Sequence, residues 1–302
     1  MVAGTGIAGK LPWNDRAGRF APLKAAALVL VSLPALWLIV KALSGGMGPG
    51  QVAIGPRPFN EAIRFLGGWT IYLLLITLAI TPARRLFDWS KLIQVRRIIG
   101  VSALCYILLH FVLYIFDSKL DLGFVATEIV TRIYLTIGFV ALLGLIALGI
   151  TSTDGWVKRL GGVRWSRLHK LIYFITPLAI LHYYMQSKID VTQPVLVSGL
   201  YFWLMGYRIM ARRGYKEGFV PLTILSVAAA LLTVVVEAAW YGIATGVSVE
   251  RVLMANLDFS FQIRPAWWVL FAGLAVTVAS EIRKRAKFGG TAARGAPAGR
   301  TG

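Results

Sequence analysis

The sequence predicts an all-α integral membrane protein, an eight-helix transmembrane bundle with both termini in the cytoplasm. Three observations support this fold class. Hydrophobic residues make up 57% of the 302-residue chain and charged residues only 15%, and the mean hydropathy is +0.70. A soluble globular chain carries about 25% charged residues, so a water-soluble core could not hide this much apolar surface. The apolar residues also gather in long runs, and basic residues fill alternate connections between these runs.

Each apolar run is close to the length that crosses a membrane. About 20 helical residues, rising 1.5 Å each, cross the hydrocarbon core. An outer-membrane β-barrel is excluded because its strands alternate polar and apolar residues, whereas these runs are apolar throughout. In chain order, the predicted spans are residues 25–44, 66–82, 98–116, 133–150, 168–186, 194–210, 219–243 and 265–281.

The basic residues predict the orientation of these spans. Of the 32 Lys and Arg residues, 24 lie in the N-terminal arm, the tail and every second connection, and the remaining 8 lie on the other side. Cytoplasmic loops carry the excess of Lys and Arg, so both termini are expected in the cytoplasm. On a soluble protein a net charge of +19 would suggest nucleic-acid binding, but here the charge follows topology and no nucleic-acid partner is expected.

The spans group into a predicted domain organisation. Residues 1–24 form a cytoplasmic arm, with no cleavable signal peptide evident. Six of the predicted spans lie within residues 25–213, and two lie within residues 214–285. The Gly- and Ala-rich residues 286–302 are expected to be a disordered basic tail. No P-loop or dinucleotide-binding glycine motif is present, so any chemistry must be carried by the bundle or by a group bound in it.

All three histidines lie in or at apolar spans: His110, His169 and His182. An imidazole in a membrane suggests a functional site, although interhelical hydrogen bonding is the simpler use. His110 lies 13 residues after Arg97 and His182 lies 15 after Arg167, which is about 19 and 22 Å along helices entering from one side. Two imidazoles at one height on facing helices suit bis-histidine ligation of a haem iron.

His169 lies 13 residues before His182 in the same predicted span. On a straight helix this spacing leaves the two rings about 140° apart, so they cannot ligate one iron. They mark two sites at different depths, or one site and one unrelated histidine, although Pro177 can kink the helix and change the angle. A lower site at His169 would lack a second imidazole. It would use another ligand, hold a five-coordinate haem or bind something else.

Several short motifs carry a resemblance to a known family. The run Arg96-Arg97-x-x-Gly100, continuing through Tyr106-x-x-x-His110-x-x-x-Tyr114-x-x-Asp117, resembles the third helix of the haem-binding subunit of the periplasmic methionine-sulfoxide reductase system (MsrQ, also called YedZ). The resemblance covers roughly residues 25–210, within the wider superfamily of ferric-reductase-like transmembrane domains. Further matching pieces are Thr81-Pro82-x-Arg84, Arg132-x-Tyr134 with Gly138, Thr151-Ser152, Gly162-x-x-Trp165-x-x-Leu168-His169, Tyr173 and His182-Tyr183.

The resemblance implies a function as well as a fold. Members are b-type cytochromes of the bacterial inner membrane, which take electrons from the quinol pool or from a cytosolic flavin reductase. They pass these electrons to a periplasmic molybdopterin enzyme, MsrP, which reduces methionine sulfoxide in oxidised proteins. Members are also described as binding FMN. For this chain the resemblance implies one or two haems b, FMN as a further cofactor, and His110, His169 and His182 as haem-ligand candidates.

Four arginines complete the predicted cofactor-binding residues. Haem propionates and an FMN phosphate are anionic and need positive partners. Arg132 is available on the outer side, and Arg96, Arg97 and Arg164 on the inner side. The simpler reading of each is a loop charge that follows the topology rule.

Two other functions stay open at this point. A self-contained ferric or quinol reductase would use the same haem without a periplasmic partner. A substrate transporter is permitted by eight spans, but no inverted repeat or paired broken helices support it. Glu237, the lone carboxylate of the seventh span, suggests a proton or quinone role, or a simple hydrogen bond to a neighbouring helix. The resemblance implies that residues 25–213 form a haem-binding, ferric-reductase-like core of six helices. Residues 214–285 add two helices that shorter members lack, and the resemblance says nothing about their role.

Overall fold

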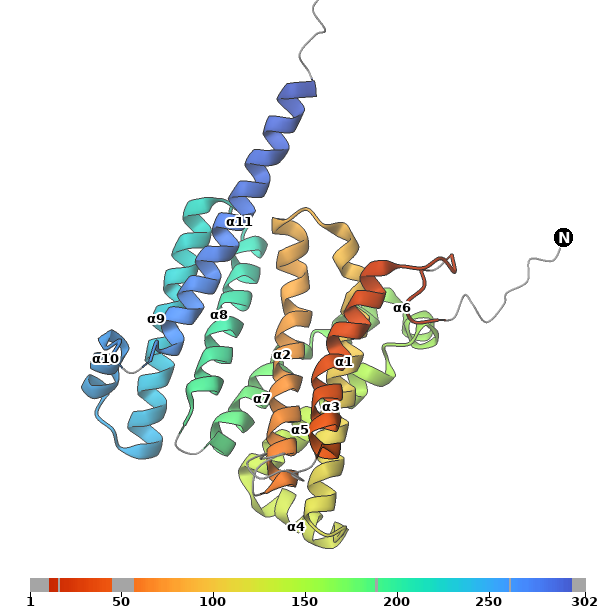
Figure 1. Cartoon of the computed structure of the whole chain (residues 1–302), viewed down its shortest axis with the longest axis vertical. Coiled ribbons are helices and arrows are strands. Elements are labelled where there is room, and N and C mark those ends of the chain that lie inside the picture. Colours follow the sequence, from red (N-terminus) through yellow and green to blue (C-terminus); the bar gives the residue numbers. More distant parts are fainter. Residues whose placement is uncertain (1–10, 16, 45–56, 188–189, 261, 295–302) are drawn as a thin grey trace, which may run out of the picture. The chain divides into compact units, whose positions relative to one another are not determined.

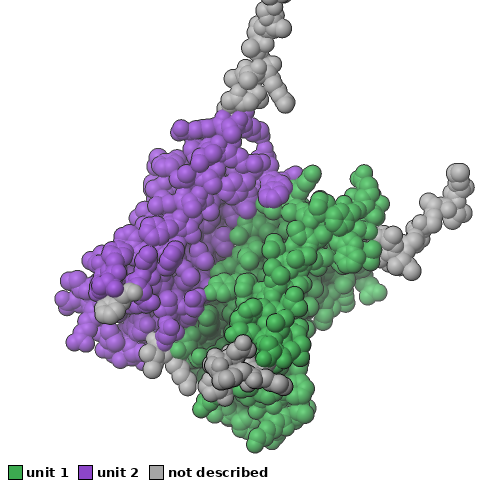
Figure 2. Space-filling model, in the orientation of Figure 1, with its two compact units in different colours: residues 1–80, 91–188 green, residues 81–90, 189–302 purple. Residues whose placement is uncertain are grey.

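The computed structural model is built from helices, and it describes residues 11–15, 17–44, 57–187, 190–260 and 262–294 (Figure 1). Contacts within the chain divide it into two compact units, which Figure 2 colours separately. Unit 1 comprises residues 1–80 and 91–188, and unit 2 comprises residues 81–90 and 189–302.

Unit 1 contains the helices that carry all three histidines. Within it, α5 packs against α7, α4 and α3, and α1 packs against α3. The α2 helix belongs to this unit up to residue 80, and its last residues belong to unit 2. The elements are α1 (Pro22–Leu43), α2 (Pro58–Leu86), the 3-10 helix η2 (Ser90–Val95), α3 (Arg96–Asp117), α4 (Leu122–Thr131), α5 (Ile133–Ile150), α6 (Asp154–His169) and α7 (Ile172–Ser187).

Unit 2 is built around three long helices that approach closely. They are α8 (Thr192–Arg212), α9 (Phe219–Thr245) and α11 (Pro265–Arg294), and the short α10 (Val249–Leu257) packs on α9. Small residues occupy the contacts. A Cβ atom on Gly199 would lie 2.2 Å from Thr233 Oγ1, and one on Gly273 would lie 2.4 Å from Ser226 Oγ. Close approach at small residues is how helices associate inside a membrane, where lipid is as apolar as leucine.

Six helical segments of the described chain are long and apolar enough to cross a membrane. This supports a multi-pass, all-helical membrane protein. The α7 helix, with 16 residues, and α8 are not among the six, so the count of eight spans stays a prediction, as does the cytoplasmic position of both termini. The six segments are Pro22–Leu43, Pro58–Leu86, Ser90–Asp117, Ile133–Ile150, Phe219–Thr245 and Pro265–Lys287.

The expected single span over residues 168–186 is broken after His169. The α6 helix ends at His169, and α7 begins at Ile172. At the break, the Lys170 amide donates to the Arg167 carbonyl at 3.2 Å, and the Leu171 amide to the Leu168 carbonyl at 3.0 Å. These three-residue bonds tighten the turn and end the α-helix. The expectation of a straight helix joining His169 to His182 was therefore wrong, and the angle of about 140° between their rings does not apply.

Three further features of the structure were not predicted, and the predicted division of the chain into domains stays a prediction. The short helices α4 and α10 lie in connections for which no helix is expected. The α8 helix falls inside the predicted core of 25–213, yet it packs with α9 and α11 in unit 2. The α11 helix continues to Arg294, into the predicted disordered tail. The rest of that tail, and residues 1–10 of the predicted arm, lie outside the described residues.

Candidate functional site

His110 and His182 meet inside unit 1. His110 lies on α3 and His182 on α7, and both helices pack against α5. The centres of the two imidazole rings are 6.5 Å apart, and the ring planes are inclined by 81°. The structure thus brings together the two histidines whose similar heights the sequence predicts. The α6–α7 break leaves this pair unaffected, because His182 is well inside α7.

A backbone carbonyl fixes each of these rings. His110 Nδ1 lies 2.7 Å from the Ile63 carbonyl oxygen on α2, and His182 Nδ1 lies 2.8 Å from the Tyr134 carbonyl oxygen on α5. A carbonyl oxygen can only accept, so each Nδ1 donates its hydrogen and each Nε2 keeps a free lone pair. An Nδ1–H bonded to a backbone carbonyl is the usual second contact of a metal-binding histidine.

A glycine gives each ring access to its carbonyl. Gly67 lies four residues after Ile63, and Gly138 lies four after Tyr134. A Cβ atom on Gly67 would be 3.1 Å from His110 Nδ1, and one on Gly138 would be 2.7 Å from His182 Nδ1. Residue i+4 sits directly beside residue i on a helix surface, so a side chain there would fill the space that the ring occupies. We call these two carbonyl–glycine pairs the Gly67 notch and the Gly138 notch.

The separation of the two rings fits a metal held from both sides. With metal–imidazole bonds of about 2.0 Å, the ring centres of two opposed ligands lie about 6.3 Å apart. The observed separation is 6.5 Å. No group of three or more His, Cys, Asp and Glu side chains suited to a metal ion occurs among the described residues. Among the described residues a metal here would have His110 and His182 as its ligands, and two imidazoles suit the iron of a haem, which would take its other ligands from the macrocycle.

The structure does not bring His169 to this pair. At the end of α6, His169 Nδ1 lies 3.1 Å from the Trp165 carbonyl oxygen, and Nε2 lies 3.3 Å from Ser152 Oγ. The rings of His169 and Trp165 stack with their centres 4.0 Å apart, and Trp165 Nε1 donates to the Thr151 carbonyl at 2.8 Å. Both nitrogens of His169 therefore already face atoms of the chain, and its role as a ligand stays a prediction.

Two of the four predicted cofactor-binding arginines are bound to carboxylates. Arg132 Nε lies 2.6 Å from Glu128 Oε2, and Arg132 Nη1 donates to the Tyr134 hydroxyl at 3.2 Å. These contacts, with Tyr134 the stronger, raise the pKa of Arg132 above its ordinary value, so it stays charged. Arg97 Nη1 lies 2.7 Å from Asp154 Oδ1. Arg96 begins α3, and Arg164 lies exposed on α6.

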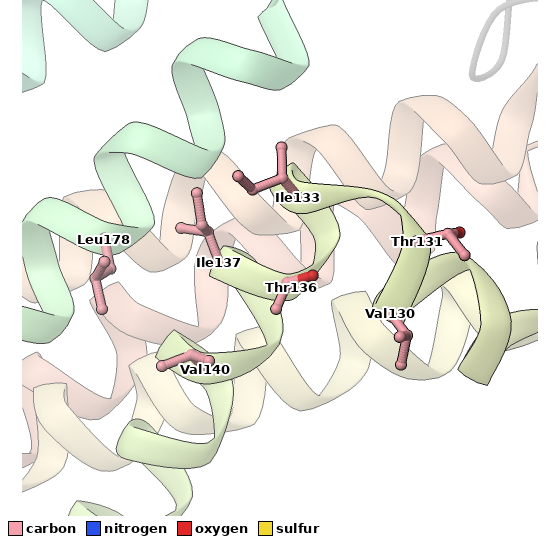
Figure 3. Close-up of a pocket in the computed structure, with 7 residues that line it drawn as sticks. All are labelled: Val130, Thr131, Ile133, Thr136, Ile137, Val140 and Leu178. Carbon is pink, nitrogen blue, oxygen red and sulfur yellow. The ribbon is translucent and has the colours of Figure 1, made fainter.

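A separate hollow of about 400 Å³ opens beside α5, between the end of α4 and α7 (Figure 3). Leu178, on the α7 side of the hollow, is one helical turn before His182. The walls are mostly aliphatic, so the hollow suits an apolar chain more than a charged ligand. Its lining residues are Val130, Thr131, Ile133, Thr136, Ile137, Val140 and Leu178.

Comparisons with known proteins identify the family of the chain. Residues 66–180 match the family described as ferric reductase like transmembrane component. A protein of Rhodospirillum rubrum named protein-methionine-sulfoxide reductase heme-binding subunit MsrQ is 37% identical over 210 residues, covering 69% of this chain and 95% of the relative. The chain belongs to the MsrQ family.

Other MsrQ proteins show the same similarity. The MsrQ of Caulobacter vibrioides is 37% identical over 181 residues, which is 60% of this chain and 83% of that protein. The MsrQ of Herminiimonas arsenicoxydans is 43% identical over 159 residues, which is 52% of this chain and 73% of that protein. No solved structure matches the chain. Membership of the MsrQ family confirms the resemblance that the motifs around His110 and His169 indicate.

Two positions of the site went unpredicted by the sequence. Gly67 and the carbonyl of Ile63 hold His110, and neither belongs to the MsrQ-like motifs described above. The Gly67-Gly68 pair inside an apolar span is the one local signal that could have indicated close approach at this position. A carbonyl acceptor has no signal in the sequence, because every residue carries one.

Proposed function

We propose that this protein is the haem b-binding membrane subunit of a methionine-sulfoxide reductase system and that it carries electrons across the membrane. The observation that carries the proposal is the His110–His182 pair, with its ring separation of 6.5 Å and both Nδ1 atoms bonded to carbonyls. The names of the MsrQ relatives support it. Bound between these two rings, a haem supplies one-electron Fe(III)/Fe(II) chemistry.

The chain's own part is to hold two neutral imidazoles in place. The bonds to the Ile63 and Tyr134 carbonyls keep the hydrogen on Nδ1 and the lone pair on Nε2 in both rings. The Gly67 and Gly138 notches prevent the rings from turning, because helix backbone lies directly behind them. His110 and His182 would hold the haem iron from these fixed positions, and a haem held in this way would supply electron transfer rather than binding of a substrate at the metal.

The proposed path runs from the cytoplasmic side to the periplasm, in the bacterial inner membrane. Its source is the quinol pool or a cytosolic flavin reductase, and its acceptor is a periplasmic molybdopterin reductase resembling MsrP. The charge distribution supports this orientation, since 24 of 32 basic residues lie on the predicted cytoplasmic side. In this orientation the His110–His182 pair lies toward the periplasm, near the acceptor.

We propose one haem in each chain. A second haem at His169 would require the contact between His169 Nε2 and Ser152 Oγ, at 3.3 Å, to open first. FMN stays a further prediction, and its phosphate would meet the exposed Arg164 rather than Arg97, which is paired with Asp154.

An absorption spectrum of the purified full-length protein tests this assignment. Dithionite should produce the bands of a reduced low-spin b-type haem, and a pyridine-haemochrome assay should give about one haem per chain. His110→Ala and His182→Ala should each abolish the bis-histidine spectrum, whereas His169→Ala should leave it intact. A colourless protein, or a spectrum that survives all three changes, would show that the ligand assignment is wrong.

A self-contained ferric reductase is the second candidate, favoured by the ferric-reductase-like match over residues 66–180. The two functions differ in what oxidises the reduced haem. A periplasmic molybdopterin methionine-sulfoxide reductase should reoxidise it rapidly in stopped-flow absorbance, and a chelated ferric salt slowly. The opposite order would favour the self-contained reductase.

A further inference from the structure

One side chain of unit 1 bridges the helices that hold the two paired histidines. Arg64, on α2, follows Ile63, whose carbonyl binds His110. Its Nη2 atom donates to the carbonyl oxygen of Gln186 on α7 at 3.0 Å. Gln186 lies four residues after His182, one helical turn further along. Arg64 therefore reaches from the helix that supports one ring to the helix that carries the other.

The Gln186 carbonyl is a suitable anchor for a cation. The α7 helix ends at Ser187, so this carbonyl belongs to the last turn, where the carbonyls have no partner within the helix. These groups carry the negative end of the helix dipole, which favours a guanidinium there. The bond uses one of the five N–H donors of Arg64, so most of the guanidinium stays available to a further acceptor.

Within the described part of the chain Arg64 forms no salt bridge with a carboxylate, and its hydrogen bond goes to a neutral carbonyl. Arg132 differs, because its guanidinium is held by Glu128 at 2.6 Å. A haem b carries two carboxylates, and an arginine binds a carboxylate through two parallel N–H bonds. Arg64 is thus an accessible cation next to the His110–His182 pair with both the charge and the free donors that such a group needs.

We propose that Arg64 binds a carboxylate of the haem at the edge of the His110–His182 site, and that its bond to Gln186 holds the guanidinium there before the haem arrives. This rests on the proposed function, which places the haem between those two histidines. Because the guanidinium is already held, less side-chain conformational entropy is lost when the haem carboxylate binds.

Haem with blocked carboxylates tests the proposal directly. The full-length chain is produced in haem-deficient cells, purified in detergent micelles, and titrated with haemin and with haemin dimethyl ester, following the Soret band. The wild type should bind haemin about tenfold more tightly than the diester, since one charge-assisted pair is worth about a factor of ten. Arg64→Gln should remove most of this preference, and Arg64→Lys should keep part of it, because lysine retains the charge but not the paired donors.

Arg57→Gln is the matched control. Arg57 is an exposed arginine just before α2, so its loss removes the same charge from the same end of that helix. It should leave the preference for haemin unchanged. For each variant the affinity for haemin is divided by the affinity for haemin dimethyl ester. A general loss of protein stability lowers both affinities and leaves this ratio unchanged. The midpoint potential of the haem gives a second readout. It should fall in Arg64→Gln, because a nearby positive charge favours the reduced iron, and it should stay unchanged in Arg57→Gln.

The outcomes separate this inference from the proposed function. Arg64→Gln protein that still prefers haemin about tenfold overturns the role of Arg64, while a normal bis-histidine spectrum leaves the haem site standing. An equal loss of the preference for haemin in Arg57→Gln would also overturn the role of Arg64. The preference would then depend on the total positive charge at this end of α2 and not on the Arg64 guanidinium. Wild-type protein that gives no low-spin spectrum with either haem would overturn the proposed function itself.

Discussion

The paired histidines are held by the same local device on two helices that are distant in sequence. On α2 the Ile63 carbonyl and Gly67 hold His110, and on α5 the Tyr134 carbonyl and Gly138 hold His182. The device sets both the tautomer and the direction of each ring without using another side chain. An imidazole held by a backbone carbonyl takes its orientation from the helix, which is how metal-binding histidines are commonly fixed.

Gly138→Ala should displace the His182 ring. The new Cβ atom would lie 2.7 Å from His182 Nδ1, which is too close for the ring to stay and keep its bond to Tyr134. We expect haem affinity to fall about tenfold or more, with loss of low-spin character, as for metal sites that lose an outer partner. Soret titration and electron paramagnetic resonance measure these effects. Gly67→Ala, at 3.1 Å from His110, should have a smaller effect.

Gly68→Ala is the matched control for both changes. A Cβ atom at Gly68 would have no heavy atom within 4 Å, so this variant should bind haem like the wild type. An unchanged spectrum in Gly138→Ala would show that the notch does not position His182. An equal loss in Gly68→Ala would point to helix stability rather than to the ring contact.

The sequence predicts the pairing of His110 with His182 but not what holds them. Their heights follow from counting residues after Arg97 and Arg167, because a helix rises by a fixed amount per residue. The Ile63 and Tyr134 acceptors could not be predicted in this way. They depend on how α2 packs against the His110 ring and α5 against the His182 ring. The periodicity of apolar residues along one helix does not show which backbone carbonyl a neighbouring side chain will reach.

At the level of elements, the least predictable feature is where a helix breaks. Leu171 and Ile172 continue the apolar run after His169, and neither Gly nor Pro marks the end of α6. Periodicity therefore predicts one helix across a turn that is closed only by three-residue hydrogen bonds. By contrast, the predicted span of 133–150 coincides with α5, whose run of apolar residues ends in Thr151-Ser152.

Gly273→Ala should loosen the packing of α11 in unit 2. A Cβ atom there would lie 2.4 Å from Ser226 Oγ and 2.8 Å from Trp203 Nε1, two atoms that share a hydrogen bond of 3.1 Å. Overpacking of this kind costs about 1–3 kcal/mol. We expect a lower thermal unfolding midpoint, read from tryptophan fluorescence in micelles, with an unchanged haem spectrum.

Gly242→Ala, on α9, provides the comparison for that experiment. Its new Cβ atom would meet the Val247 carbonyl oxygen at 3.8 Å, an ordinary contact. Its midpoint should stay within about 1 °C of the wild type, since surface-like substitutions change stability little. Identical midpoints for the two alanine variants would argue against close small-residue packing between α8, α9 and α11.

At the level of the whole molecule, the described contacts of the histidine pair lie inside unit 1, and unit 2 has a polar core of its own. Glu237 on α9 is 1% exposed. Its Oε1 atom lies 3.3 Å from Arg264 Nη2, and its Oε2 atom accepts from Asn256 Nδ2 at 2.9 Å. The sequence singles out Glu237 as a buried carboxylate but not these partners, because both come from the connection between α9 and α11, where polar residues are ordinary.

Arg264→Gln should destabilise unit 2 more than Glu237→Gln. Glu237 is almost fully buried, whereas the Arg264 side chain is 17% exposed, so losing the arginine leaves the deeper charge unpaired. Breaking a buried pair from one side costs about 3 kcal/mol or more, and removing both charges restores part of that. The double variant should therefore unfold at a higher temperature than Arg264→Gln alone. Because the proposed haem ligands His110 and His182 lie in unit 1, all three folded variants should keep the bis-histidine spectrum. A spectrum that changes with Arg264→Gln in the folded protein would instead show that the contacts of Glu237 with Arg264 and Asn256 affect the proposed haem site.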